Sequence, residues 1–395
     1  MKSAKIGNQW LVIDPATAGL SGTYLAEMER STAYLQQKIF FVGNFYCPGA
    51  NIWRLFYKYS ELHAQPRYRL GRLRLLVRSL ELVYALARIV VRTAIQRYKT
   101  VCYALSSNLL AEYAFLWVLK HLVRCKVIII CHDVIPFVGV GESLQSKSNT
   151  RARFYRLADF LLVHNSNSRS DLMKVFGVQP AKIYSVPFPV MDPWLLETRV
   201  RNKPSPKSST ETQFLFVGHL RQEKGIDVLI SAWKIAQTQL SKSTLVIAGN
   251  RPRGVKIDVS ELDRSRVTVI TRYLSDDELL DLVDQCDCVI LPYRRGTNSG
   301  IPGTVLVLER DLIVSDIPMF KNNTLIPPHA FFASENAEAL AKRIVEYESE
   351  KLSGRIKQNP IYRGSIADYK KHYARQIYAM IIKIEEAREG DKCSQ

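Results

Sequence analysis

The sequence is short of acidic residues: 37 Asp and Glu are present against 55 Lys and Arg, so the formal net charge of the 395 residues is +18. A positive excess of this size indicates an anionic partner, which can be nucleic acid, an acidic membrane surface or a phosphorylated substrate. Charge alone does not select among the three. The hydrophobic content of 47% is ordinary for a globular enzyme, so neither a disordered nor a fibrous chain is indicated.

The sequence also lacks a cysteine framework. The pair Cys286-Asp-Cys288 has no second pair at zinc-ligand spacing, and the other cysteines are scattered. An odd number of unpatterned cysteines, mostly in or beside apolar runs, predicts buried, reduced thiols in a reducing compartment. The seven are Cys47, Cys102, Cys125, Cys131, Cys286, Cys288 and Cys393.

Long apolar runs are missing as well. No window reaches the ~18 uncharged apolar residues that a membrane-spanning helix needs. The N-terminal stretch lacks the apolar core and small-residue cleavage site of a signal peptide. We therefore expect a cytoplasmic protein, soluble or peripherally bound at the inner face of the cell membrane.

Short apolar runs alternate with helical periodicity along most of the chain, which predicts an α/β fold with largely parallel sheets. Each half carries its own set of strand candidates and can build its own doubly wound, Rossmann-like sheet. In the first half the expected strands are Trp10–Asp14, Ile39–Gly43, Thr100–Leu105, Lys126–Cys131 and Phe160–Asn165. In the second half they are Phe214–Gly218, Thr244–Gly249, Val267–Thr271, Cys288–Tyr293 and Leu312–Asp316.

A polar stretch rich in Ser, Lys and Pro, Arg199–Gln213, separates the two sets and is expected to link two domains. We predict an N-terminal domain over residues 1–195, a linker over 196–213 and a C-terminal domain over 214–365. A C-terminal helix and tail over 366–395 is expected to pack back on the N-terminal domain. Ligands of such open sheets bind at the carboxyl ends of the strands, in a crevice expected between the domains.

The stretch "VGHLRQEKGID" joins an expected strand, ending at Gly218, to an expected helix. Backbone N–H groups at a helix N-terminus already favour an anion. Arg221 adds a forked donor and Lys224 a point charge, a pair suited to a diphosphate, and Gly225 follows them directly. The alternative is a solvated basic loop without a ligand.

A second loop, at the carboxyl end of the strand expected over Cys288–Tyr293, reads "PYRRGTNSG". Its last residues, Asn298, Ser299 and the amide of Gly300, are candidates to face a phosphate or a sugar.

Together these two loops resemble those of the retaining glycosyltransferases of family 4, which have the GT-B fold. The Arg-x-x-Lys-Gly sequence resembles the family's phosphate-binding loop, and "PYRRGTNSG" resembles a "PYR...SG" donor loop found in one branch. "HDVIPF", which begins at His132, resembles the histidine loop of the N-terminal domain. Most members carry a Glu-x7-Glu pair, whereas this chain has Gly296 and Thr304 there, and Glu309 where relatives usually have glycine.

The resemblance implies transfer of a sugar from a UDP- or GDP-linked donor to a glycan or lipid-linked saccharide, in polysaccharide or glycolipid biosynthesis. It implies that Arg221 and Lys224 stabilise the departing diphosphate, that His132 contacts the sugar or acceptor, and that Gly22 lets a ligand approach the backbone. No cofactor and no metal ion are expected. The residues expected to bind the donor are Gly218, Gly225, Asn298, Ser299, Gly300 and Thr304.

The stretch Arg67–Lys99 carries nine cations and a single acid, Glu81. One helical face is apolar, and the membrane candidates Arg74, Arg78, Arg88 and Arg92 gather on another. Such a helix can lie on an anionic leaflet. Alternatively, it is a domain helix with its apolar face in the core and its basic face solvated. The apolar positions are Leu73, Leu76, Leu80, Val83, Ala87, Val90 and Ala94.

Two other functions remain open. A nucleic-acid-binding protein would account for the charge, but the sequence shows neither a helix-turn-helix nor an RNA-binding signature, so no nucleic-acid partner is expected. A degenerate transferase that binds nucleotide sugars or acts as a scaffold, without turnover, is compatible with the absent glutamate pair.

Overall fold

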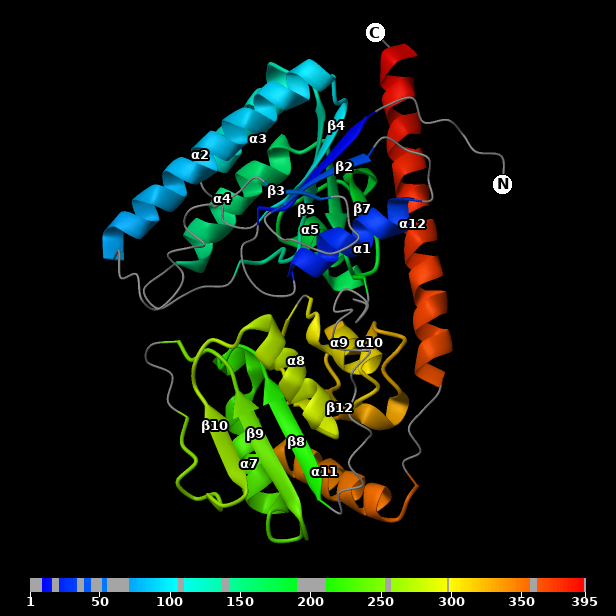
Figure 1. The fold of residues 1–395 in the computed structure, drawn as a ribbon. Coiled ribbons are helices and arrows are strands. Elements are labelled where there is room, and N and C mark those ends of the chain that lie inside the picture. The colour runs from blue at the N-terminus through cyan, green and yellow to red at the C-terminus, as the bar shows by residue number, and fades with distance from the viewer. Residues whose placement is uncertain are drawn as a thin grey trace. The chain divides into compact units, whose positions relative to one another are not determined.

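The computed structural model describes residues 9–15, 21–33, 39–43, 52–54, 71–105, 110–136, 143–189, 211–252, 257–296, 298–355 and 361–393. The chain forms two compact units (Figure 1): an N-terminal unit of Met1–Pro189 with Lys370–Gln395, and a C-terminal unit of Val190–Tyr369. Residues 196–210 of the expected linker lie outside the described residues. Each unit contains a parallel sheet with helices, so the predicted α/β fold class is confirmed.

The N-terminal unit is built on a seven-stranded parallel sheet with the order β3-β2-β1-β4-β5-β6-β7. The chain runs from β1 toward one edge and from β4 toward the other, so the topological switch point lies between β1 and β4. The strands are β1 (Trp10–Ile13), β2 (Ile39–Gly43), β3 (Ile52–Arg54), β4 (Thr100–Ala104), β5 (Lys126–Ile130), β6 (Phe160–Val163) and β7 (Ile183–Ser185).

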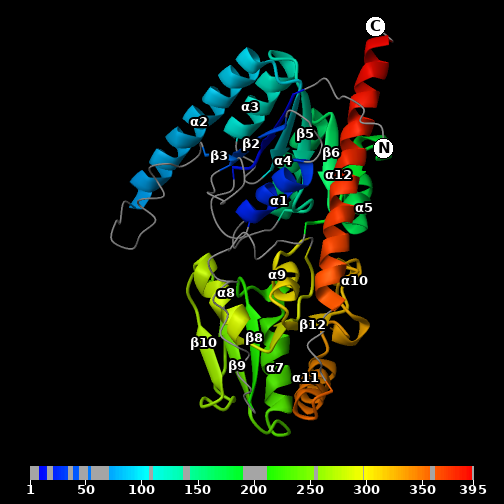
Figure 2. The same ribbon diagram turned by 45° about the vertical axis from the view of Figure 1, so that its right-hand side comes forward.

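Successive side chains of a strand point to opposite faces of the sheet, so alternate residues of these strands pack in two separate cores. Leu11, Val101 and Ile129 belong to the core covered by α2, α3 and α4, whereas Val12 and Ile128 belong to the core covered by α1 and α12. Helix α2 lies beside α3 on the outside of the unit (Figures 1 and 2). The helices are α1 (Ser21–Ala33), α2 (Gly71–Gln96), α3 (Leu110–His121), α4 (Leu144–Leu157), α5 (Ser166–Lys174) and α12 (Ile361–Cys393).

The C-terminal helix packs on the N-terminal unit, as predicted. From Lys370 onward α12 belongs to this unit, and its Tyr373 and Ile377 are buried in the core that Val12 enters. Trp10 of β1 donates a hydrogen bond of 2.8 Å from Nε1 to Oε1 of Glu385. This buried contact joins residues at the two ends of the chain.

The C-terminal unit is built on a six-stranded parallel sheet with the order β10-β9-β8-β11-β12-β13. The chain runs outward from β8 to β10 and then from β11 to β13, so β8 and β11 flank the switch point. Their pairing is Phe214 with Cys288 and Leu215 with Val289. The strands are β8 (Thr212–Val217), β9 (Ser243–Ala248), β10 (Val267–Ile270), β11 (Cys288–Leu291), β12 (Asp311–Ser315) and β13 (Phe331–Phe332).

Helices cover both faces of this sheet. Helices α7 and α11 lie side by side on one face (Figure 2), where the ring of Phe214 contacts Trp233 of α7 and Tyr347 of α11. Helix α8 begins with a capping box between Ser275 and Glu278. The elements are η4 (Gln222–Lys224), α7 (Ile226–Ala236), α8 (Asp276–Gln285), α9 (Ile301–Val307), α10 (Pro318–Lys321), η5 (Pro328–Ala330) and α11 (Ala337–Leu352).

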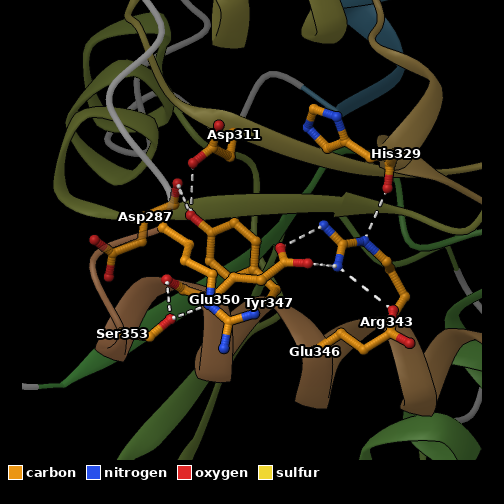
Figure 3. Close-up of polar contacts among 9 residues, drawn as sticks. Asp287, Asp311, His329, Arg343, Glu346, Tyr347, Glu350 and Ser353 are labelled. Carbon is orange, nitrogen blue, oxygen red and sulfur yellow. Dashed lines mark hydrogen bonds and ion pairs between the residues drawn. The ribbon is translucent and has the colours of Figure 1, made fainter.

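A network of polar side chains ties α11 to the amino ends of β11 and β12 (Figure 3). The Tyr347 hydroxyl donates to Oδ2 of Asp311 at 2.7 Å and contacts the carbonyl of Asp287 at 3.2 Å. Arg343 donates to the His329 carbonyl and, through both terminal nitrogens, to Glu350. Burial raises the pKa of Asp311 above its usual value. Because ligands of parallel sheets bind at the opposite, carboxyl ends, we interpret this network as structural.

Five of the cysteines, Cys102, Cys125, Cys131, Cys286 and Cys288, are buried and free, as expected of core thiols. Cys47 lies outside the described residues. Among the helices that the structure describes, none is long and apolar enough to cross a membrane.

Candidate diphosphate and sugar site

Two glycines shape the loop that follows β8. Gly218 follows the last residue of β8 at φ 142°, and Gly225 closes the turn η4 in the left-handed conformation at φ 65°. A Cβ atom on Gly225 would lie 1.9 Å from the carbonyl oxygen of Pro292. Both the backbone angle and the contact therefore require glycine at this position.

The two expected cations stand at the ends of this turn. Arg221 is the exposed residue before η4, and Lys224 is its half-buried last residue. The Lys224 ammonium lies 3.6 Å from the centroid of the Tyr293 ring, a cation–π contact. Among the ion pairs between described residues, none involves either cation. Desolvation and the charges of Arg221 and Lys224 lower the pKa of His219, which the sequence analysis did not single out.

Arg294 fastens the second loop to the first. Its backbone N–H donates to the Glu223 carbonyl at 3.0 Å, and its Nη1 donates to the Gln222 carbonyl at 2.8 Å. Its two terminal nitrogens hold the Asp227 carboxylate at 2.7 and 2.6 Å, and its Nε donates to Glu335 at 2.9 Å. Hydrogen bonding from Arg294 lowers the pKa of Asp227. The loops after β8 and β11 thus form one connected structure.

Tyr293 is the second anchor of this connection. Its ring is buried beneath Lys224, and its carbonyl accepts a 2.6 Å hydrogen bond from the Ser315 hydroxyl at the end of β12. Arg295 adds an exposed ion pair of 3.2 Å with Glu223. The roles of Tyr293 and Arg294 were not predicted from the sequence, although both lie in the stretch singled out as a donor loop.

The other expected donor-binding residues lie just beyond. Asn298, Ser299 and Gly300 are half-buried, and Gly300 immediately precedes α9. Thr304 is buried in α9, and its hydroxyl donates to the Gly300 carbonyl at 3.1 Å, so that proton is used inside the helix. Glu309 has a left-handed backbone at φ 58°, a conformation that glycine adopts without strain.

His132 lies in the N-terminal unit, directly after β5, within a group of rings. Its ring centroid is 4.7 Å from that of Tyr24, 5.3 Å from that of His164 and 6.2 Å from that of Phe188. Burial lowers the pKa of His132, and burial together with His132 lowers the pKa of His164 to about 3. Since His164 Nδ1 lies 3.1 Å from the Val186 carbonyl, which can only accept, Nδ1 carries a proton and donates it to that carbonyl. This group of rings around His132 was not predicted from the sequence.

The remaining candidates are also in the N-terminal unit. Gly22 lies in the first turn of α1 rather than in a loop before it. Arg74 and Arg78 lie in α2, and their side chains are not among those that the structure describes. Arg88 of the same helix is exposed and Arg92 is half-buried. The structure therefore groups Arg221, Lys224 and the donor loop in one unit and places His132 in the other.

If α2 is a domain helix, the sequence predicts that the apolar face containing Leu80 and Val83 lies in the core. For the described side chains this prediction is wrong. The buried face instead consists of Leu82, Ala85, Leu86, Ile89 and Thr93. Leu76, Leu80, Val83, Ala87 and Ala94 of the expected face are exposed. The helix is apolar on both faces, so its periodicity alone does not identify the buried one.

A known family model matches part of this chain. Residues 198–307 match the family model described as "Glycosyl transferases group 1", and this segment contains the Arg221–Gly225 turn and the donor loop. No curated protein matches the sequence significantly.

Solved structures of low sequence identity share the fold over nearly the whole chain. Sucrose-phosphate synthase from Thermosynechococcus elongatus is 15% identical with a TM-score of 0.55, covering 98% of this chain and 99% of that one. α,α-Trehalose 6-phosphate synthase from Burkholderia multivorans is 11% identical with a TM-score of 0.63, covering 98% of both. Anabaena HepE in complex with UDP-glucose is 13% identical with a TM-score of 0.60, covering 94% and 99%. The chain thus has the two-domain GT-B fold and carries, over residues 198–307, a glycosyl transferases group 1 domain.

Proposed function

We propose that this protein is a retaining glycosyltransferase that moves a sugar from a UDP- or GDP-linked donor to a glycan or lipid-linked saccharide. The observation that carries the proposal is the pair of cations without ion-pair partners among the described residues, Arg221 and Lys224, at the switch point of the C-terminal sheet. The family match over residues 198–307 supports it. So do the UDP-glucose bound to HepE and the UDP-2-fluoro glucose bound to the Escherichia coli trehalose-6-phosphate protein of similar fold.

In this reaction the bond from the sugar to the diphosphate breaks and its electrons stay on the phosphate oxygen. The acceptor hydroxyl forms the new bond to the same carbon, and its proton passes to the departing diphosphate. Arg221 and Lys224 offset the charge that develops on the diphosphate, and the amide of Gly300 and the Ser299 hydroxyl hold a phosphate or sugar oxygen. Because Arg294 fixes the turn in advance, these donors need little reorganisation during the reaction.

The N-terminal unit is proposed to take the acceptor. His132 is held in place by Tyr24 and His164, and Arg151 donates to the Asp133 carbonyl next to it. A neutral imidazole in this position can hydrogen-bond a sugar hydroxyl. Polysaccharide or glycolipid biosynthesis is the proposed setting.

A nucleotide-sugar binder without turnover is the second candidate. Gly296 and Thr304 favour it, because they stand where most members of the resembling family have glutamates. It is also favoured by the hydrogen bond that the Thr304 hydroxyl donates within α9.

Release of the nucleoside diphosphate tests the proposal and separates the two candidates. The purified chain is incubated with UDP- and GDP-linked hexoses together with a panel of glycan and lipid-linked saccharide acceptors, with and without EDTA, and free UDP or GDP is measured. We expect release from one class of donor that EDTA does not change, because Arg221 and Lys224 supply the positive charge. Loss of release in EDTA, restored by magnesium or manganese, would contradict metal independence. Binding without release from any donor would support the second candidate.

A further inference from the structure

Helix α2 exposes a continuous apolar face on the outside of the N-terminal unit. Leu80, Val83, Tyr84, Val91 and Ile95 have between 54% and 70% of their surface exposed. Leu80, Tyr84, Val91 and Ile95 are four, seven and four residues apart, that is one or two helical turns, and Val83 lies three residues after Leu80, so they share one face. Single exposed apolar residues are ordinary, whereas a contiguous stripe of this kind marks an interaction surface.

This face is separate from the one that holds α2 in the fold. Leu82, Leu86 and Ile89 are buried in the core formed with α3 and the sheet. On a helix with 3.6 residues per turn, each of them points roughly opposite to the exposed face. Covering the exposed face therefore needs no change in the packing of the unit. Figures 1 and 2 show α2 on the outer side of the unit, beside α3.

The charge on α2 indicates what covers this face. The helix contains five arginines and a single acid, Glu81. A shallow hollow of about 510 Å³ along the exposed face is lined by Val91 and Ile95 together with the cations Arg88 and Arg92. The Arg88 guanidinium lies 5.6 Å from the centroid of the exposed Tyr84 ring. Apolar side chains bordered by arginines and a tyrosine are the composition of a helix that lies in an anionic lipid interface.

We propose that the exposed face of α2 docks the protein on an anionic lipid bilayer, with Leu80, Val83, Val91 and Ile95 in the acyl boundary and Arg88 and Arg92 at the headgroups. Leu80 and Val83 belong to the apolar face expected from the sequence, and on this surface apolar and basic residues act together. The inference does not depend on the proposed transferase activity.

The test is cosedimentation of the full chain with vesicles, without donor or acceptor. One set of vesicles is phosphatidylcholine alone, and the other contains phosphatidylglycerol as well. We expect binding to the anionic vesicles that falls as salt is raised, and at least about tenfold weaker binding to neutral ones. The variant Leu80→Ser/Val91→Ser should lose binding while its thermal unfolding stays unchanged, because both side chains are exposed.

A matched control is Leu352→Ser in the C-terminal unit, since Leu352 is a leucine of similar exposure, 51%. This variant should bind like the wild type. Wild-type failure to bind anionic vesicles, equal binding to neutral vesicles, or undiminished binding of Leu80→Ser/Val91→Ser would overturn the proposal. A dimer in solution that Leu80→Ser/Val91→Ser dissociates would also overturn it and identify the face as a contact between two copies.

Discussion

Alanine in place of Lys224 is expected to lower the maximal rate of diphosphate release by about 10²- to 10³-fold, or about 3–4 kcal/mol of barrier. The reason is that the ammonium stands on a fixed turn beside Arg221 without an ion-pair partner among the described residues, available to the developing charge of the leaving group. The rate is measured at saturating donor, so that weaker donor binding does not account for the loss.

Two controls separate chemistry from folding in this experiment. The cation–π contact of Lys224 with Tyr293 contributes on the order of 1 kcal/mol, so the variant should unfold near the wild-type temperature. Lys342→Ala removes a lysine whose side chain is 80% exposed on α11, and it should keep the full rate. Near-normal turnover of Lys224→Ala would show that Lys224 does not stabilise the departing diphosphate.

Gly225→Ala is expected to destabilise the C-terminal unit by about 3–5 kcal/mol. The added Cβ meets a left-handed backbone angle and also the Pro292 carbonyl oxygen at 1.9 Å, so the turn and the donor loop must separate. Amide hydrogen exchange in β8 and α7 of the full chain reports this loss for the C-terminal unit alone.

Gly354→Ala provides the matched control, because Gly354 has nearly the same backbone angle, φ 66°, and no atom within 4 Å of its added Cβ. This variant should lower the stability of the C-terminal unit only by the backbone strain, about 1–2 kcal/mol. Equal exchange in the two variants would show that the contact with Pro292 contributes nothing to the stability of the turn.

The strands were the most predictable part of the fold. Buried parallel strands are short continuous apolar runs, and every run singled out in the two halves forms a strand. The strands that were missed, β3, β7 and β13, contain only two or three residues at or near sheet edges, too few to show a pattern. The face of α2 was not predictable, because a helix with apolar residues on both sides does not show which side meets the sheet.

The candidate site was predictable where its residues are adjacent in sequence. Arg221, Lys224 and Gly225 form one turn, and a strand before and a helix after them indicate an anion site. The bidentate ion pair between Arg294 and Asp227 joins residues 67 positions apart, and only the β8–β11 pairing brings them together. The left-handed angle of Glu309 was hidden for another reason: glutamate gives no local sign of a position that glycine would suit.

The proposed function requires the Arg221–Gly225 turn to bind a nucleoside diphosphate. A thermal-shift comparison of UDP, GDP, ADP and CMP tests it most directly, with the wild type and Lys224→Ala side by side. At 100 times its dissociation constant a ligand stabilises the folded protein by about 2.7 kcal/mol. We expect one nucleoside diphosphate to raise the unfolding temperature of the wild type and not that of the variant. No shift with any nucleotide, or the same shift in both proteins, would contradict it.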